Sequence, residues 1–287
     1  MIEVETRAAS RRTWVVALLA GALRIACYAP VLWSLVHQWS TDDDMGHGFF
    51  VPVVAGYLVW QRRERLRAIE PSPCWWGMLL VLCGMAQSYI ARMGTELFLS
   101  RTAFLVSLTG AVLFLGGRAY LRALAFPLFV LLFMVPIPGI IYGKITFPLQ
   151  LLASRLAHNA LLLMDIPVLR EGNVLVLPEQ TLSVVEACSG IRSRLSLTFL
   201  ALFYSYLFET RKWMRVVLFV ATIPIAIIAN AGRVTLTGVL AEYRPELAEG
   251  FFHAASGWVI FMIALAILLA FHKALAGAAA LWRKRAG

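Results

Sequence analysis

Long apolar blocks are the feature that most constrains what this chain can fold into. Two of them run from Leu195 to Leu207 and from Val216 to Ala229. The 287-residue chain is 60% hydrophobic and only 15% charged, with a mean hydropathy of +0.76, whereas soluble domains carry about 25% charged residues. A helix of about 20 apolar residues crosses a hydrocarbon layer of about 30 Å. The sequence therefore excludes a soluble protein and predicts a multi-pass membrane protein.

Hydropathy windows of about 19 residues predict eight membrane-crossing helices. They cover residues 14–37, 46–60, 74–91, 98–116, 121–137, 189–208, 216–232 and 256–273. We expect the first span to stay as an anchor, because its apolar run is too long for a cleavable signal. The fold class is thus an all-α polytopic membrane protein. We predict one domain over 1–287, with its core at 38–273 and a basic cytoplasmic tail at 274–287.

Positive charge gathers in every second connection between the predicted spans, and it accounts for much of the net charge of +10. The clusters are Arg7, Arg11 and Arg12; Arg62, Arg63, Arg65 and Arg67; Arg118 and Arg122; Arg211, Lys212 and Arg215; and Lys273, Arg283, Lys284 and Arg285. Cytoplasmic loops are enriched in such residues. The alternation predicts both termini in the cytoplasm, with loops 38–45, 92–97, 138–188 and 233–255 on the other side. Orientation explains these charges, so we expect membrane lipids and no nucleic acid as partners.

The long segment 138–188 enters and leaves on the outer side, so it should not cross the membrane. Its apolar stretch from Ile145 to Met164 is interrupted by Pro148 and by polar residues such as Arg155. This pattern predicts an interfacial or re-entrant helix. Short β-branched runs around Gly172-Asn173 follow it, over 167–185. This pattern predicts a small periplasmic β-hairpin beside the helices.

One cysteine stands apart from the other three. Cys27, Cys74, Cys83 and Cys188 form no CxxC pair and no metal-ligand spacing, which excludes a zinc site and a disulfide framework. Cys188 alone lies at a predicted water interface, just before a helix that we expect to begin near Ser189. A helix N-terminus lowers the pKa of a thiol, and Arg192 adds a positive charge on the same helical face. Alone, such a cysteine is more often a small apolar packing residue than a nucleophile.

Arg233 and His253 lie at the outer ends of the seventh and eighth predicted spans. Taken singly, they are typical of a snorkelling cation and of a polar residue in the interfacial belt. Together with the outer-facing thiol of Cys188, they match the groups that acyl transfer requires: a nucleophile, a proton carrier and a cation for the oxyanion. Because all three residues are predicted at the outer face of the membrane, the pattern favours catalysis.

Several motifs resemble those of the exosortase/archaeosortase family of membrane-embedded cysteine transpeptidases. They are Glu186-Ala-Cys-Ser-Gly-Ile-Arg-Ser193, Asn230-Ala-Gly-Arg233, His253-Ala-Ala-Ser-Gly257, Gly46-His-Gly-Phe49, Pro136-Ile-Pro138 and Arg170-Glu-Gly-Asn173, within a match from about 38 to 270. The resemblance implies that Cys188 is the nucleophile, Arg233 the transition-state stabiliser and His253 the general acid and base. Arg194 departs from the family pattern, which has an apolar residue after Ile-Arg-Ser.

The resemblance also implies a substrate and a place in the cell. The substrates are secreted proteins that end in a Pro-Glu-Pro-like motif, a transmembrane helix and a basic tail. They are cleaved through a thioester and transferred to an acceptor that the sequence does not identify. The implied location is the inner membrane of a Gram-negative bacterium, with the site facing the periplasm.

Further residues are candidates for substrate binding. Arg192 or Arg194 would bind the motif's carboxylate, although Arg192 equally tunes the thiol or pairs with Glu186. We also place His47 and Asn230 at the site. Three adjacent acids, Asp42, Asp43 and Asp44, precede His47, but neighbours in sequence converge poorly on a cation, so we expect no metal and no cofactor.

Two other functions compete with transpeptidation. One is a membrane protease that only hydrolyses its substrate. The other is a transporter or export subunit, in which Arg24, Arg155 and Arg194 line a pathway for an anionic solute. The transporter hypothesis requires charges along the membrane depth, whereas here they lie mainly near one face.

Overall fold

The computed structural model describes residues 26–178, 180–183, 191–243 and 251–286, without the side chains of 43, 44, 191–196, 251–257 and 282–286. The chain divides into two compact units, Met1–Ile137 and Pro138–Gly287. Each unit is considered by itself. The single domain expected over 1–287 stays a prediction.

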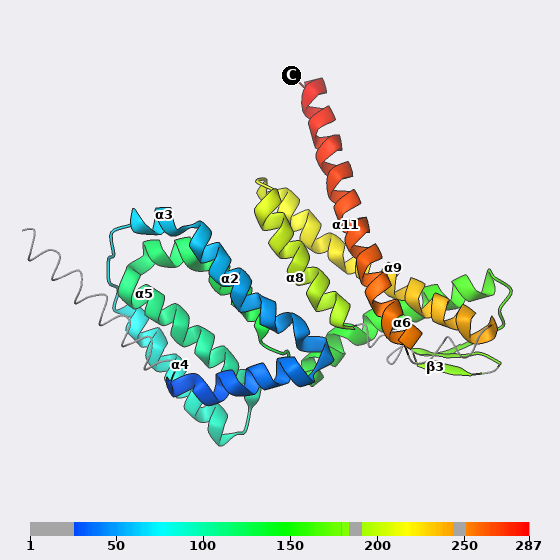
Figure 1. Cartoon of the computed structure of the whole chain (residues 1–287), viewed down its shortest axis with the longest axis horizontal. Coiled ribbons are helices and arrows are strands. Elements are labelled where there is room, and N and C mark those ends of the chain that lie inside the picture. Colours follow the sequence, from blue (N-terminus) through cyan, green and yellow to red (C-terminus); the bar gives the residue numbers. More distant parts are fainter. Residues whose placement is uncertain (1–25, 179, 184–190, 244–250, 287) are drawn as a thin grey trace, which may run out of the picture. The chain divides into compact units, whose positions relative to one another are not determined.

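The first unit consists of helices (Figure 1). A helix at 26–41 is followed by η1 (Asp43–Phe49), α2 (Phe50–Gln61), α3 (Arg63–Arg67), α4 (Trp76–Met93), α5 (Leu97–Val130) and η2 (Leu131–Met134). These elements coincide with the described parts of the first five predicted spans.

Helix α5 is bent back on itself at Gly117, so it consists of two arms. Gly117 has φ +80° and ψ −171°, which is not helical. Leu108 in the first arm and Leu128 in the second line the same apolar cavity of about 260 Å³, together with residues of α2. A straight helix would separate them by about 30 Å. The two arms, 97–116 and 118–130, therefore match two of the predicted spans, 98–116 and 121–137.

Small residues bring α4 and the first arm of α5 into close contact. An added Cβ at Gly110 would lie 2.7 Å from the backbone nitrogen of Val81, and one at Gly84 would overlap Ser107. Tyr28 fills the adjoining groove and makes a 2.9 Å hydrogen bond with the hydroxyl of Ser107. Without a hydrophobic driving force in lipid, such close backbone packing holds membrane helices together.

In its described residues, the second unit has four long helices and a small sheet. The helices are α6 (Gly139–Leu162), α8 (Ile191–Phe208), α9 (Lys212–Tyr243) and α11 (Phe251–Ala286). The strands β1 (Leu169–Glu171), β2 (Val174–Val176) and β3 (Thr181–Ser183) form an antiparallel sheet in the order β1-β2-β3. Glu171 pairs with Val174 across a turn at Gly172, whose φ of +64° suits glycine. This confirms the predicted hairpin and adds a third strand.

Two apolar clusters organise this unit around α9. Leu197, Met214, Leu218 and Leu268 belong to a cluster that joins α8, α9 and α11. The other joins α6, the sheet and the second half of α9 through Leu161, Leu175 and Val234, with Leu182 of β3 packed against it. Helix α9 therefore packs with two different sets of partners along its length.

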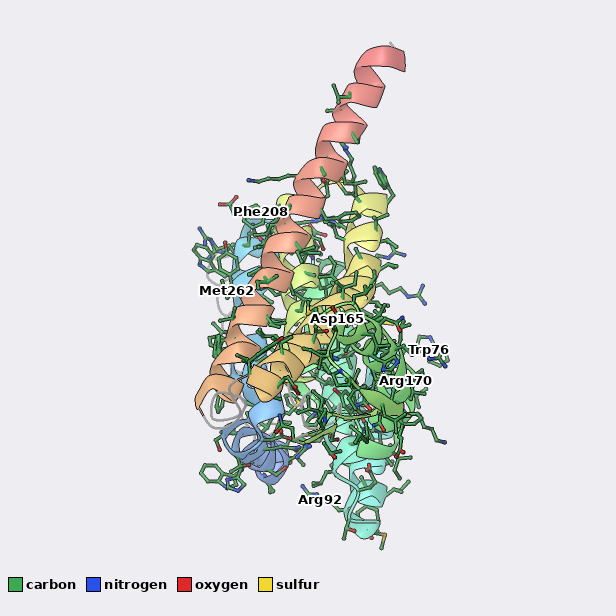
Figure 2. All side chains as sticks on the ribbon, turned by 90° about the vertical axis from the view of Figure 1, so that its right-hand side faces the viewer. Trp76, Arg92, Asp165, Arg170, Phe208 and Met262 are labelled. Atoms are coloured by element: carbon green, nitrogen blue, oxygen red, sulfur yellow. The ribbon has the colours of Figure 1, made fainter. Side chains whose placement is uncertain are left out.

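Many large apolar side chains point outward from the helices. Trp76 on α4, Phe208 on α8 and Met262 on α11 are examples (Figure 2). Among the described residues, three helices are long and apolar enough to cross a membrane: Leu97–Met134, Lys212–Tyr243 and Trp258–Leu281. This composition confirms a multi-pass membrane protein. The count of eight crossings is not confirmed and stays a prediction.

One predicted boundary is wrong. The seventh predicted span ends at 232 and is followed by an outer loop, but α9 continues to Tyr243. The sequence from Val234 to Tyr243 is polar enough to lower the hydropathy, yet its small residues pack on α6: an added Cβ at Gly238 would lie 3.0 Å from Leu161. Tertiary packing extends this helix beyond its apolar block.

The bend in α5 leads to a prediction about stability. An added Cβ at Gly117 would overlap the carbonyl oxygen of Ser72, and the positive φ disfavours any side chain. Gly117→Ala should lower the free energy of unfolding by about 1–3 kcal/mol or more. Gly56→Ala is the control, because nothing lies within 4 Å of its added Cβ. Equal thermal unfolding temperatures of the two variants in detergent would contradict the bend.

Candidate active site

Helices α8, α9 and α11 form the scaffold of the candidate site. Only three residues, Glu209–Arg211, connect α8 to α9, so these two helices are antiparallel. Ala264 and Leu268 of α11 pack in the same cluster as Leu197 and Ala201 of α8, and the later residue His272 contacts Tyr204. Helix α11 therefore runs parallel to α8, as Figure 1 also shows.

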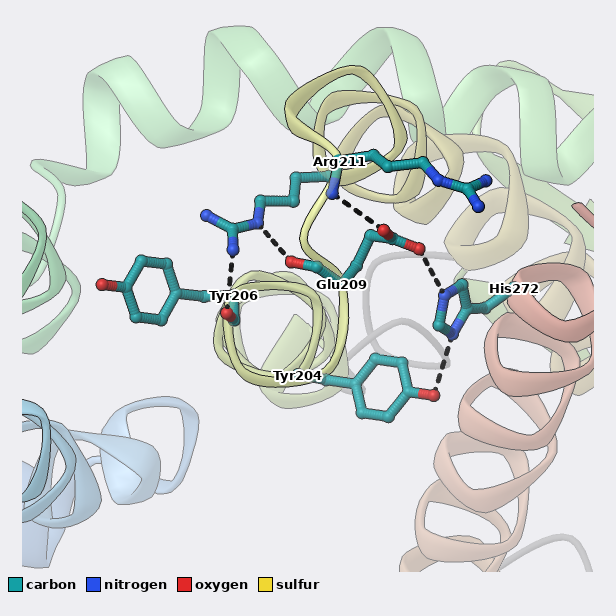
Figure 3. A network of polar contacts seen from close by, with 6 residues as sticks. Tyr204, Tyr206, Glu209, Arg211 and His272 are labelled. Atoms are coloured by element: carbon teal, nitrogen blue, oxygen red, sulfur yellow. Dashed lines mark hydrogen bonds and ion pairs between the residues drawn. The ribbon is translucent and has the colours of Figure 1, made fainter. Parts of the chain in front are cut away.

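A buried polar network joins these helices at one end (Figure 3). His272 Nε2 lies 3.3 Å from Glu209 Oε2, and His272 Nδ1 lies 2.9 Å from the hydroxyl of Tyr204. Glu209 and His272 are only 8% and 9% exposed. Because an ionised carboxylate only accepts hydrogen bonds, Nε2 carries the proton that is donated to Glu209, and in the neutral imidazole Nδ1 accepts from Tyr204. We call these three residues the Glu209–His272–Tyr204 network.

Backbone contacts fix Glu209 in this network. The Arg211 amide donates to Glu209 Oε1 at 2.8 Å, and Arg215 Nε donates to the Glu209 carbonyl at 2.7 Å. The Arg211 amide is the main reason that the pKa of Glu209 is lowered; burial acts against this, and the His272 bond adds to it. The carboxylate is therefore held both in position and in its charged form.

The network gives a reference level from which the predicted site residues are placed along the helices. His253 precedes His272 by 19 residues, and Arg233 follows Arg215 by 18. At a rise of 1.5 Å per residue, His253 lies about 28–29 Å from His272, and Arg233 lies about 27 Å from Arg215, which binds the carbonyl of Glu209. Ile191, the first residue of α8, precedes Tyr204 by 13 residues, or about 20 Å. Parts of three helices that are far apart in sequence thus reach the same end of the bundle.

Arg233 lies inside α9 and is buried. It is 4% exposed and shares a buried face of the helix with Asn230 and Thr237. Its neighbour Val234 packs on α6 and the sheet. A guanidinium inside an apolar helix is costly, so such residues usually serve a function. The structure thus brings Arg233 and Asn230 together on one face of α9. The sequence predicted Arg233 at the end of this helix, whereas Arg233 lies inside it.

Most of the other predicted site residues have side chains outside the described part of the structure. Arg192 and Arg194 belong to the first turn of α8, and His253 to the first turn of α11, but their side chains lie outside the described part of the structure. Cys188 and Glu186 lie in 184–190, also outside the described residues. His47 is half-buried on η1 of the first unit, where an added Cβ on the next residue, Gly48, would overlap Trp39.

The sequence does not predict the Glu209–His272–Tyr204 network. The partners of His272 are 63 and 68 residues away in sequence, so no local motif reveals them. A signal did exist. Glu209 is the only acidic residue between Ala187 and Ala241, and it lies beside a basic cluster that the charge alternation places on the same side as Lys273.

Comparison with known proteins identifies the family but no individual relative. Searches of curated proteins and of solved structures found no match. A sequence model described as transmembrane exosortase matches residues 39–270, which is most of the chain and spans both compact units. The chain therefore belongs to the transmembrane exosortase family.

Proposed function

We propose that this protein is a membrane-embedded cysteine transpeptidase that cleaves the C-terminal Pro-Glu-Pro-like sorting signal of secreted proteins and transfers them to an acceptor. Membership in the transmembrane exosortase family implies a membrane transpeptidase or protease. The finer assignment is supported by the placement of α8's first turn, Arg233 and the first turn of α11 toward the same end of the bundle, opposite the Glu209–His272–Tyr204 network. We propose that the segment before α8 supplies the nucleophile, α9 the cation and α11 the imidazole.

The proposed reaction begins with attack by the thiolate of Cys188 on the carbonyl carbon of the scissile peptide bond. The resulting oxyanion is stabilised by Arg233. His253 gives a proton to the leaving nitrogen, the C–N bond breaks, and a thioester remains on Cys188. His253 then accepts a proton from the acceptor nucleophile, which attacks the thioester and releases the thiolate. The substrate's own transmembrane helix supplies proximity, because it holds the motif at the membrane surface.

The burial of Arg233 supports its assignment as the oxyanion-stabilising group. Electrostatic interactions are stronger where water is excluded, and a preorganised cation needs no reorganisation when the charge develops. Arg233 is held by a helix that packs on α6, on the sheet and on α8. Asn230, three residues earlier on the same buried face, is suited to orient the substrate by hydrogen bonding.

The remaining candidates are proposed to recognise the substrate. Arg192 and Arg194 follow Cys188 by four and six residues, so either reaches a carboxylate in the sorting motif. We propose the same role, substrate recognition, for Glu186 and His47. We propose that Arg194, the departure from the family pattern, faces water or a head group, because a guanidinium is costly in hydrocarbon.

The proposed topology has eight crossings, both termini in the cytoplasm and the site facing the periplasm of a bacterial inner membrane. The bend in α5 supports it by dividing one long helix into two. The contact between Glu209 and His272 also supports it, since it brings the basic clusters at 211–215 and 273 to the same end of the bundle. In this arrangement α6 lies at the interface and the sheet lies on the periplasmic side.

Hydrolysis is the competing outcome of the same first step. A thioester that reacts with water gives a free carboxylate, whereas an acceptor adds its own mass to the product. Mass spectrometry of the processed protein therefore separates the two. Family membership disfavours the transporter hypothesis. That hypothesis has Arg155 line a solute pathway, whereas Arg155 is an exposed residue of α6.

Substitution of the nucleophile is the most direct test. Cys188→Ala should abolish processing of a secreted protein with the sorting signal, because no thioester can form, and should leave the thermal unfolding temperature unchanged. The control is Cys83→Ala, which replaces an exposed cysteine of α4 and should process the same protein normally. The measurement is the appearance of the shortened product in membranes. Full processing by Cys188→Ala would refute the assignment.

Substitution of Arg233 tests the proposed oxyanion role. Arg233→Gln should lower kcat by about 100- to 1,000-fold, because the positive charge is lost. Arg233→Lys keeps the charge and should retain part of the activity. Arg155→Gln on α6 is the control for loss of an exposed arginine. If Arg233→Gln folds, as judged by thermal unfolding, and turns over normally, Arg233 does not stabilise the oxyanion.

Substrate recognition can be tested by substitutions in the substrate and in the enzyme. Replacing the Glu of the sorting motif by Gln should raise KM by about 10-fold, since a charge-assisted bond is lost. The same exchange should have little effect on the Arg192→Gln or the Arg194→Gln enzyme, whichever arginine makes the contact. Identical KM values for both substrates with the unaltered enzyme would exclude recognition of this carboxylate by an arginine.

A further inference from the structure

We propose that the Glu209–His272–Tyr204 network sets the axial position of α11 against α8 and α9, and through it the position of His253 at the active site. This inference rests on the proposed function. The network lies about 27–29 Å from Arg233 and His253 along their helices, so its three residues touch neither substrate nor reacting atoms. They are positioning residues.

Apolar packing alone defines the axial position of α11 poorly. Its buried contacts with α8 and α9 are made by residues such as Ala264 and Leu268, with the small Ala276 and Ala279 packed nearby. Leucine and alanine faces accept a slip of one helical turn, about 5.4 Å, at little cost. A polar group in such an interface is different, because only one register satisfies its hydrogen bonds. His272 supplies that polar group on α11.

The partner of His272 is itself fixed. The carboxylate of Glu209 is oriented by the amide of Arg211, and the adjoining backbone is held by Arg215, which also donates to the carbonyl of Tyr206 at 3.2 Å. These contacts lie in the turn between α8 and α9 and in the adjoining ends of the two helices (Figure 3). A slip of α11 would leave both the buried carboxylate and the imidazole without their bond, which is costly in a low-dielectric interior.

A helix transmits such a shift over its whole length. From His253 to His272 the chain contains no proline, and α11 is continuous from Phe251 to Ala286. Any axial displacement at His272 therefore appears at His253 with nearly the same size. Because a misplacement of about 1 Å can cost about 100-fold in rate, a slip of one turn would disconnect the imidazole from the thiol and the leaving group.

The first test is kinetic and uses the full-length protein in nanodiscs. His272→Ala should lower kcat by about 10- to 100-fold with KM within about twofold, because the substrate still binds. In a His253→Ala background, adding His272→Ala should change kcat by less than about twofold, since the group that it positions is already absent. An equal loss in both backgrounds would overturn the proposal. His37→Ala, an exposed histidine of the helix at 26–41, is the matched control.

Tyr204→Phe keeps the inference falsifiable if His272→Ala does not fold. It removes one hydrogen bond and keeps the ring that contacts His272 edge-on, with ring centroids 5.4 Å apart. The expected loss in kcat is about 3- to 10-fold, again absent in the His253→Ala background. An unchanged kcat in both single variants, Tyr204→Phe and Glu209→Gln, would overturn the role of the network.

The second test does not depend on catalysis. Spin labels at the exposed positions Ile228 on α9 and Trp258 on α11 report the axial position of α11 in a chain whose native cysteines are replaced by serine. His272→Ala should shift the distance distribution by several ångströms, up to one turn, or broaden it. An unchanged, narrow distribution would overturn the positioning role. Full processing by Cys188→Ala would instead refute the function, so the two failures are distinguishable.

Discussion

The backbone of a chain in hydrocarbon must satisfy its own hydrogen bonds, and most of this structure follows from that constraint. Long helices pair every amide internally, which is why apolar blocks become helices rather than open strands. The described strands are confined to a three-stranded sheet of short segments that packs on α6 and α9. In such a bundle each buried polar side chain is expensive. Buried ionisable groups such as Arg233 and the Glu209–His272 pair are therefore informative about function and register.

The two ends of the α8, α9 and α11 bundle have different chemistry. At one end an ionised carboxylate is stabilised by hydrogen bonds from a backbone amide and an imidazole, and it joins α11 to the turn between α8 and α9. At the other end Arg233 is buried next to the apolar cluster of α6 and the sheet. A bundle held rigidly at one end and carrying a cation at the other is suited to catalysis by preorganised charge.

The sequence predicts the location of the described helices well, because hydropathy is summed over many residues and tolerates local error; the count of eight crossings stays a prediction. It also predicts the turn at Gly172-Asn173, where the residue types dictate the backbone. It does not predict the extension of α9 to Tyr243, because that depends on Gly238 fitting against Leu161 of another helix. Nor does it predict the contact of His272 with Glu209, since burial and geometry rather than spacing bring them together. Arg233 and Asn230 were recognised from their motif, but their burial was not.

The packing of Leu182 has a consequence for the thiol. Leu182 on β3 is fixed to the same apolar cluster as Val234, and α8 is fixed to α9 from Leu197 onward. Cys188 follows Leu182 by six positions in the sequence. Fully extended, that length spans about 21 Å. Chain connectivity alone therefore limits how far Cys188 can lie from the apolar cluster that holds Leu182 and Val234.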